Sequence, residues 1–242
     1  IGKEHVKSYS ATLESYQSVY KGLSETKPDV LVLISPHGEQ RPSIQGFVSE
    51  HFTSNLKMFG DLTFNQTYKS SYLFLVKLKK RLKNVLFSLT TEQSLDYGVS
   101  VPLALFRNQG QRTVGNDIHV PDTGITIPIC PIRVSQENVV THFQFGSHLY
   151  EEIASLEKNI AILATGDLAH THKGSSLAEL SKSFDHTLIQ ALKNKDVETL
   201  IHPHGDLEPE SVGACCLKPL AVLLGSLGEQ SYAPHILSYE NS

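Results

Sequence analysis

DVLVLISPHG, residues 29–38, decides the fold and raises the first question about function. Its first seven residues form a mainly apolar run of strand length, and such runs are typical of parallel strands that are covered on both faces. The run stops at Pro36, His37 and Gly38. We therefore predict a buried strand that ends in a histidine, where an imidazole can bind a metal or transfer a proton.

Segments with the periodicity of helices and of strands alternate along the rest of the chain. Helices are predicted at residues 2–25, 70–84, 137–158, 176–200 (one helix or two) and 212–227, with a short helix within 96–106. Further strands are predicted at residues 85–89, 159–166 and 233–240, and at residues 124–134 as an edge strand or in two pieces, since Pro128 and Pro131 interrupt that run. The alternation predicts one α/β domain over residues 1–242, with a central, mostly parallel sheet flanked by helices.

The composition excludes several classes of function. The 242 residues carry a net charge of −4 with no basic stripe, which argues against a nucleic-acid partner. No apolar stretch approaches the roughly 20 residues that span a bilayer, so we expect no membrane segment. Three cysteines give no disulfide framework, and we expect a cytoplasmic protein. The chain begins at IGKEH without an initiator methionine, so we expect further residues upstream.

Two of the predicted strands end in turns that carry histidines. His37 follows the first strand, and His170 follows the strand at residues 159–166, with Asp167 three positions before it. Because ligands of open α/β sheets bind beyond the carboxyl ends of the strands, we expect these side chains at one edge of the sheet. The alternative is that each histidine only caps backbone groups in its own turn.

A third group of candidate ligands precedes the last predicted helix. It consists of Glu210, Cys215 and Cys216, and carboxylates and thiolates both bind metals. A position at a helix N-terminus would also lower the pKa of a thiol. The alternative is that both cysteines are small core residues. Weaker candidates are HPHG, residues 202–205, and the turn-rich segment that holds Asp117, His119 and Asp122.

Taken together, the motifs resemble a known family. IGKEH, KPDVLVLISPHG, LDYGVSVPLALF, ATGDLAHTH, FDHTLIQAL and ACCLKPLAVLLGSL stand in the order found in the LigB superfamily. That superfamily holds the class III extradiol ring-cleavage dioxygenases and the Memo-like proteins, and the chain is most similar to the AmmeMemoRadiSam-type branch. The resemblance covers nearly the whole chain and implies an α/β sheet flanked by helices.

The resemblance also implies a site, a mononuclear non-heme Fe(II) held by two histidines and a third ligand. His37 corresponds to the second metal histidine, His170 to the catalytic histidine beside the metal, and Asp167 to an acidic residue of the same turn. The first metal histidine would lie in a Pro-His-x-Pro stretch upstream of Ile1. Tyr97 stands where the family usually has a histidine, and it could hydrogen-bond the oxygen species.

The third ligand separates two functions. Extradiol dioxygenases use a glutamate, for which Glu210 is nearest, whereas the Memo branch uses a cysteine, for which Cys215 fits best and Cys216 is one residue away. We expect an Fe(II)-dependent extradiol dioxygenase that acts on a catechol-type aromatic and O2. The alternatives are a Memo-like metal-binding or redox protein that holds copper, iron or zinc without cleaving rings, and a site-depleted interaction protein. A homo-oligomer is compatible with each.

Overall fold

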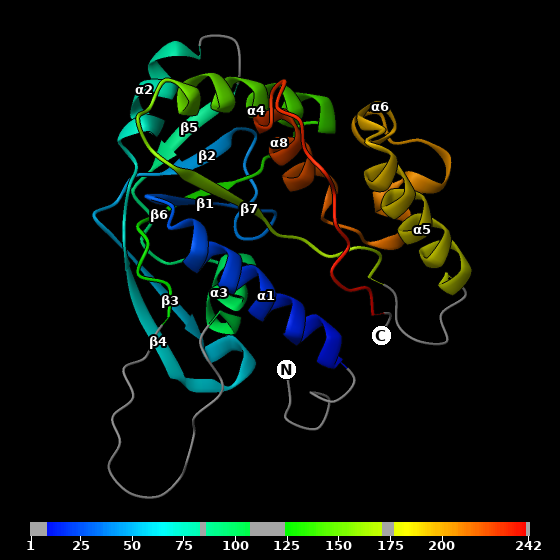
Figure 1. Cartoon of the computed structure of the whole chain (residues 1–242), viewed down its shortest axis with the longest axis horizontal. Coiled ribbons are helices and arrows are strands. Elements are labelled where there is room, and N and C mark those ends of the chain that lie inside the picture. The colour runs from blue at the N-terminus through cyan, green and yellow to red at the C-terminus, as the bar shows by residue number, and fades with distance from the viewer. Residues whose placement is uncertain (1–8, 83–85, 107–123, 171–176, 241–242) are drawn as a thin grey trace, which may run out of the picture.

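A computed structural model describes residues 9–82, 86–106, 124–170 and 177–240. Its centre is a five-stranded mixed sheet in which β6, β1 and β7 run parallel, while β2 and β5 run parallel to each other and β2 is antiparallel to β6. In spatial order the strands are β5 (Phe87–Thr90), β2 (Ile44–Phe47), β6 (Ile129–Arg133), β1 (Val30–Ser35) and β7 (Ile160–Ala164). The sheet confirms the predicted α/β class (Figure 1).

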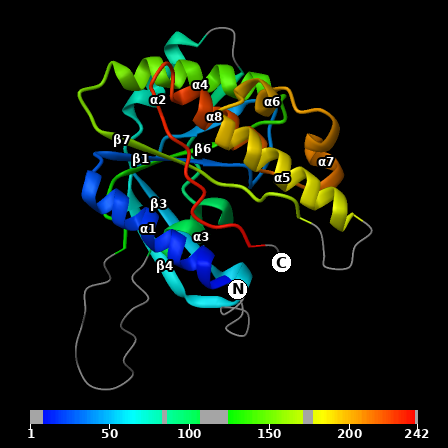
Figure 2. The same ribbon diagram turned by 45° about the vertical axis from the view of Figure 1, so that its right-hand side comes forward.

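Helices cover both faces of the sheet (Figures 1 and 2). One face packs against α2 (Leu73–Arg81), α4 (Val139–Ala154) and α8 (Leu217–Ser226). The other packs against α1 (Ser10–Thr26), α3 (Tyr97–Leu105) and the hairpin of β3 (His51–Leu56) and β4 (Asp61–Lys69), whose tip is η2 (Lys57–Phe59). A third cluster joins α8 to α5 (Ala178–Asn194), α6 (Val197–Ile201), η3 (Gly205–Leu207) and α7 (Pro209–Val212).

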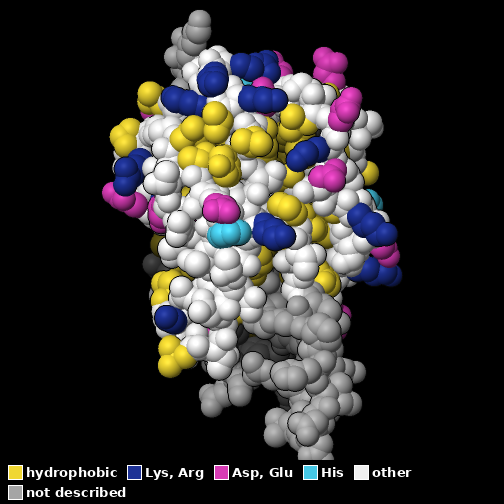
Figure 3. Space-filling model, turned by 90° about the vertical axis from the view of Figure 1, so that its left-hand side faces the viewer, with side chains coloured by type: hydrophobic (Ala, Val, Ile, Leu, Met, Phe, Trp, Pro, Cys, Tyr) yellow, Lys and Arg dark blue, Asp and Glu magenta, His cyan; other side chains and the backbone are white. Residues whose placement is uncertain are grey.

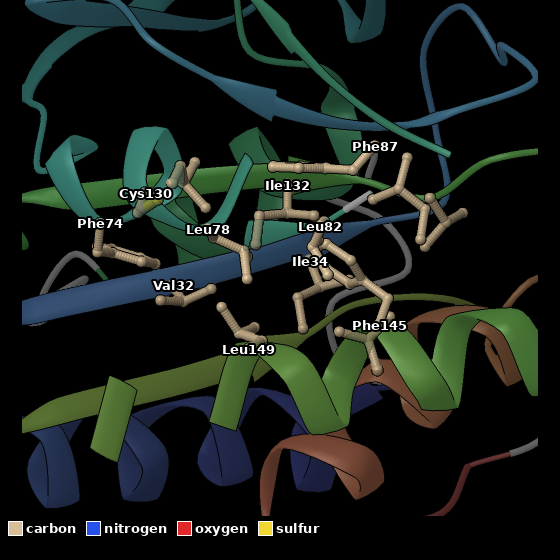
Figure 4. Packing of buried hydrophobic residues seen from close by; sticks show 14 of the residues in the cluster. Val32, Ile34, Phe74, Leu78, Leu82, Phe87, Cys130, Ile132, Phe145 and Leu149 are labelled. Atoms are coloured by element: carbon tan, nitrogen blue, oxygen red, sulfur yellow. The ribbon is translucent and has the colours of Figure 1, made fainter. Parts of the chain in front are cut away.

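Strand β1 lies in the middle of the core, since all six of its residues are buried. Val32 and Ile34 point toward α4, where they meet Phe145 and Leu149 (Figure 4). Leu31 and Leu33 point to the opposite face of the sheet, toward α3. Burial of each such side chain contributes about 1.5–3 kcal/mol, so the apolar run at residues 29–35 fixes the middle of the sheet.

The strand predicted within residues 124–134 is confirmed as β6, but its predicted place at an edge of the sheet is wrong, because β6 lies between β2 and β1. The carbonyl of Pro128 accepts from the Leu31 amide of β1, and the amide of Val134 donates to the Ser35 carbonyl of β1. The backbone groups of the even-numbered residues in this segment therefore point toward β1. Pro131 therefore turns its nitrogen toward β2, which pairs with β6 only from Ile132 onward. An interior proline is tolerated here because the missing N–H would have met no ladder partner.

The strand predicted at residues 233–240 is also wrong. This segment pairs with no strand in the described part of the chain and crosses the molecule as an irregular strap (Figures 1 and 2, red). Side chains hold it in place. The Tyr239 hydroxyl donates to Asp185 at 2.8 Å, and the Glu240 carboxylate accepts from the backbone amides of Ala11 and Thr12 at the start of α1. The strap therefore links α5 to α1.

Other boundaries differ in detail from the prediction. The segment predicted as one helix or two is two, α5 and α6, separated by Lys195 in the left-handed region at φ 58°. The predicted helix at residues 2–25 is described from Ser10 onward. Strand β2 and the β3–β4 hairpin were not predicted.

Candidate functional site

The ends of β1 and β7 bring two of the predicted turns together. The strands are parallel neighbours, and Ile34, one residue before the end of β1, pairs with Ala164, the last residue of β7. His37 therefore leaves the sheet beside the turn that carries Asp167 and His170. This is the shared edge that the sequence predicted for these side chains.

Cys215 contacts both of these turns. Its Sγ atom lies 3.7 Å from His37 Nε2 and accepts a hydrogen bond of 3.1 Å from the backbone N–H of Asp167. The backbone amides of Cys215 and Cys216 in turn both donate to the Asp167 carbonyl at 3.1 Å. The two cysteines precede α8, so Cys215 is presented from a turn and not from within the helix.

The His37 and Cys215 atoms fit two ligands of one metal ion. Metal distances of about 2.3 Å to sulfur and 2.0–2.1 Å to nitrogen with tetrahedral angles place the two ligand atoms about 3.6 Å apart, close to the separation found here. His37 Nδ1 is hydrogen-bonded to the Tyr97 hydroxyl at 2.8 Å, as is usual for a metal-binding histidine. Among the described residues, no three His, Cys, Asp or Glu side chains form a complete metal site.

Tyr97 is the first residue of α3, and its ring stacks on His37 with centroids 4.1 Å apart. Phe59, at the tip of the hairpin, packs edge-on against the same ring at 5.9 Å. Tyr97 therefore lies in the site, as predicted from the sequence. Its side chain orients His37 and is itself partly exposed.

Burial decides the protonation of the two central groups. It lowers the pKa of His37, against the opposing effect of the carboxylates of Asp96 and Asp167. Burial also raises the pKa of the Cys215 thiol, so the expected lowering by a helix N-terminus does not win. Cys216 is more deeply buried, and desolvation raises its pKa to about 12. Without a bound cation, both thiols are therefore held as neutral S–H groups.

His170 and Asp167 form a second, exposed pair at this edge. Their side chains approach to 3.8 Å between Nδ1 and Oδ2, with 70% and 65% of each exposed. The backbone N–H of His170 donates to the Val212 carbonyl at 2.8 Å, which ties this turn to α7. The backbone of Asp167 contacts Cys215, and both side chains of the pair are open to solvent, so they can exchange protons with water.

Glu210 lies on the wall of a cleft of about 930 Å³ that opens onto Cys215. Its carboxylate acts on Lys218, opposing the lowering of that ammonium pKa by burial. In the described part of the chain, Glu210 makes no hydrogen bond or ion pair with His37 or Cys215. His202 and His204 of HPHG line the same cleft. His172 and residues 115–123 lie outside the described residues.

Three further residues of the site were missed from the sequence. Tyr16 of α1 is mostly buried, and after burial itself the Asp167 carboxylate raises the pKa of its phenol, so α1 reaches the site. Asp96 and Arg133 lie behind His37. The sequence did carry a signal for Asp96 and Arg133. Each is a charged residue in an otherwise apolar segment, and such residues are almost never buried unless they are paired.

Comparison with known proteins identifies the family. Residues 2–241 match the family model of the catalytic LigB subunit of aromatic ring-opening dioxygenase. The chain belongs to the LigB family. It is 23% identical over 258 residues to Protein CA_C1420 of Clostridium acetobutylicum, covering all of this chain but 52% of that protein. The chain thus spans about half the length of this relative.

A solved structure supports the fold. The crystal structure of the uncharacterized protein JW3007 from Escherichia coli K12 aligns with a TM-score of 0.58 and 20% identity, over 90% of this chain and 82% of that one. None of the described helices has the length and apolar character needed to cross a bilayer. One face of the surface carries basic, acidic and apolar side chains intermixed (Figure 3).

Proposed function

We propose that this LigB domain is a metal-dependent redox protein in which His37 and Cys215 are two of the metal ligands. The observation that carries the proposal is the 3.7 Å separation of His37 Nε2 and Cys215 Sγ at the edge where the family match implies a metal. A thiolate ligand favours Cu(I), Zn or Fe over ions that prefer oxygen ligands. Glu210 stays a candidate for a further ligand.

The residues around the pair have separable tasks. Tyr97 holds the His37 ring through Nδ1, which directs Nε2 toward Cys215. The Asp167 amide donates to Cys215 Sγ and would stabilise its thiolate once a cation has displaced the thiol proton. A copper or iron ion would supply redox as well as Lewis-acid chemistry, whereas zinc would supply only the Lewis acid. His170, beside Asp167, can exchange protons with solvent or substrate.

A second candidate is catechol ring cleavage with Fe(II) and O2, as the family description implies for its dioxygenase members. The acid–base pair of His170 and Asp167 favours it, because ring cleavage needs a group that takes a phenol proton and returns it. Cys215 in the ligand position weighs against it. We also propose a location in the reducing cytoplasm, which the lack of a disulfide among the three cysteines supports.

Metal loading of two serine variants tests the site. Wild type, Cys215→Ser and the neighbouring control Cys216→Ser are loaded anaerobically with Fe(II), Cu(I) or Zn(II) and then desalted, and metal content is measured. We expect one ion per chain in wild type and in Cys216→Ser, and strong loss in Cys215→Ser. Equal loading of all three proteins would refute Cys215 as a ligand.

Oxygen uptake with catechols separates the two candidates. The Fe(II)-loaded wild type is mixed with catechol and protocatechuate, and ring-opened product is followed by its visible absorbance. Product formation that depends on bound iron supports the dioxygenase. Metal binding without any product, under conditions where the iron stays bound, supports the redox protein.

A further inference from the structure

Arg133, on the interior strand β6, is the most deeply buried charged residue behind the site, with 2% of its side chain exposed. Its guanidinium donates to Gln45 at 3.2 Å and to both carboxylate oxygens of Glu92 at 3.1 and 3.3 Å. It also lies 4.8 Å from the centre of the Phe47 ring. A buried arginine with this many fixed contacts has one geometry, since its planar fork is held on several sides.

A chain of polar contacts leads from Arg133 to His37. Arg133 Nε lies 3.8 Å from Asp96 Oδ2 and has no hydrogen-bond partner among the described residues. The other oxygen of Asp96 accepts from the Ser35 hydroxyl at 2.7 Å, and Ser35 Oγ accepts from the His37 backbone N–H at 3.2 Å. The chain therefore connects an interior charge to the turn that carries the proposed ligand.

Asp96 reaches His37 by a second route. It is the N-cap of α3, where its side chain accepts from the Val99 amide at 3.3 Å. Tyr97 follows it directly and contacts His37 Nδ1. Asp96 thus sets both the backbone anchor and the side-chain anchor of the histidine.

The packing leaves this arrangement little freedom. Gly38 has φ +94°, and a Cβ atom there would lie 2.6 Å from the Arg133 guanidinium carbon. A Cβ on Gly98 would lie 2.4 Å from Ser35 Oγ and 2.8 Å from the His37 ring. Glycine is required where two segments approach so closely, so the turn after β1 rests directly on the buried arginine.

We propose that the buried Arg133–Asp96 pair is a positioning unit that fixes the orientation and the tautomer of His37. The pair does not touch the proposed metal, and its effect passes through Ser35 and Tyr97. For Nε2 to bind a metal, the ring proton must sit on Nδ1, where the Tyr97 oxygen can accept it. The inference rests on the proposed role of His37 as a ligand.

Two substitutions separate position from charge. Asp96→Asn removes one of the two carboxylate charges that face Arg133 but keeps the N-cap, because asparagine caps helices as well as aspartate does. Arg133→Lys keeps the charge but loses the planar fork. The control is Asp196→Asn at the exposed N-cap of α6. Should Arg133→Lys fail to fold, Ser35→Ala replaces it, since it keeps every charge and removes only the bridging hydroxyl.

The first readout is nitrogen NMR of the metal-free protein, in which the shifts of Nδ1 and Nε2 report the tautomer of His37, assigned by comparison with His37→Gln. The second is the affinity for Zn(II) ions, measured well below each unfolding transition. We expect one tautomer in wild type and in Asp196→Asn. In Asp96→Asn and Arg133→Lys we expect mixed tautomers and an affinity lower by about 10–100-fold, as for other groups that orient metal ligands.

Two results would overturn the proposal. One is that both variants show the same His37 nitrogen shifts and the same affinity for Zn(II) as the wild type. The other is weaker binding in Asp96→Asn alone, which would make the effect one of charge and not of position. If wild type itself bound no Zn(II), the proposed function would be in doubt, while the tautomer comparison in the metal-free protein would still decide the positioning role.

Discussion

The turns after β1 and β7 lie side by side but are held in opposite ways. The turn with His37 rests on buried side chains, since Arg133 and Asp96 expose 2% and 8%. The turn with Asp167 and His170 exposes most of both side chains and is held largely through backbone hydrogen bonds. We infer that the first turn keeps a ligand atom in a fixed place and that the second exchanges protons.

Of the changes to the two turns, removal of the His37 side chain should have the largest effect, which is on metal binding. We expect His37→Ala to lose metal binding, by more than about 100-fold in affinity, since even a residue that only orients a ligand contributes 10–100-fold. Elemental analysis after loading with Zn(II) or Fe(II) measures it. His148→Ala, which changes a partly exposed histidine on α4, is the control. Unchanged metal content in His37→Ala would remove the fixed ligand from the first turn.

His170→Ala should separate the two turns by function. We expect it to keep its metal and to lose about 10²–10⁴-fold in the rate of any reaction the wild type catalyses, because positioned acid–base groups contribute that much. Metal content and turnover are measured on one preparation, with the exposed His186→Ala as control. Loss of metal from His170→Ala would make it a ligand and the division between the turns would be wrong.

The same two turns show what the sequence could predict. The strand at residues 29–35 and its parallel partner β7 were predicted because a fully buried strand needs a continuous apolar run. Strand β3 was missed because its buried positions are Phe52 and the polar Ser54, so no apolar run marks the strand. The interior place of β6 was missed because the tolerance of Pro131 depends on where β2 begins to pair, which no local pattern encodes.

In the site, the strand-end rule brought His37 and the Asp167 turn to one edge, as predicted. The choice of Cys215 beside His37 came from long-range packing, which joins residues 178 positions apart. The support by Arg133 and Asp96 was invisible for the same reason, since the sequence separates them and their contact depends on how β6 and α3 meet.

Acid should destabilise the fold by protonating a buried histidine near the end of β6, the strand that carries Arg133. Burial lowers the pKa of His142 from 6.5 to about 4, where its Nε2 accepts from the Ser135 amide, next to the end of β6. Between these pH values the unfolded chain binds the extra proton, so stability falls as pH falls, by about 3 kcal/mol in total. Urea unfolding from pH 7 to 4 measures it. The difference between pH 7 and 4 should shrink in His142→Gln and persist in the surface control His148→Gln.

The smallest expected effect compares the two turns by stability alone. Asp96→Asn removes one of the two carboxylates that face the buried Arg133, the other being that of Glu92, and we expect a loss of about 1–3 kcal/mol, since weakening the partner of a buried charge has this cost. Asp167→Asn changes an exposed carboxylate, and we expect a change within about 0.5 kcal/mol. Urea unfolding of both metal-free variants at pH 7 measures the difference. Equal losses would mean that the turn after β7 is braced as firmly as the turn after β1, and the division between a fixed ligand and an exposed proton carrier would lose its physical basis.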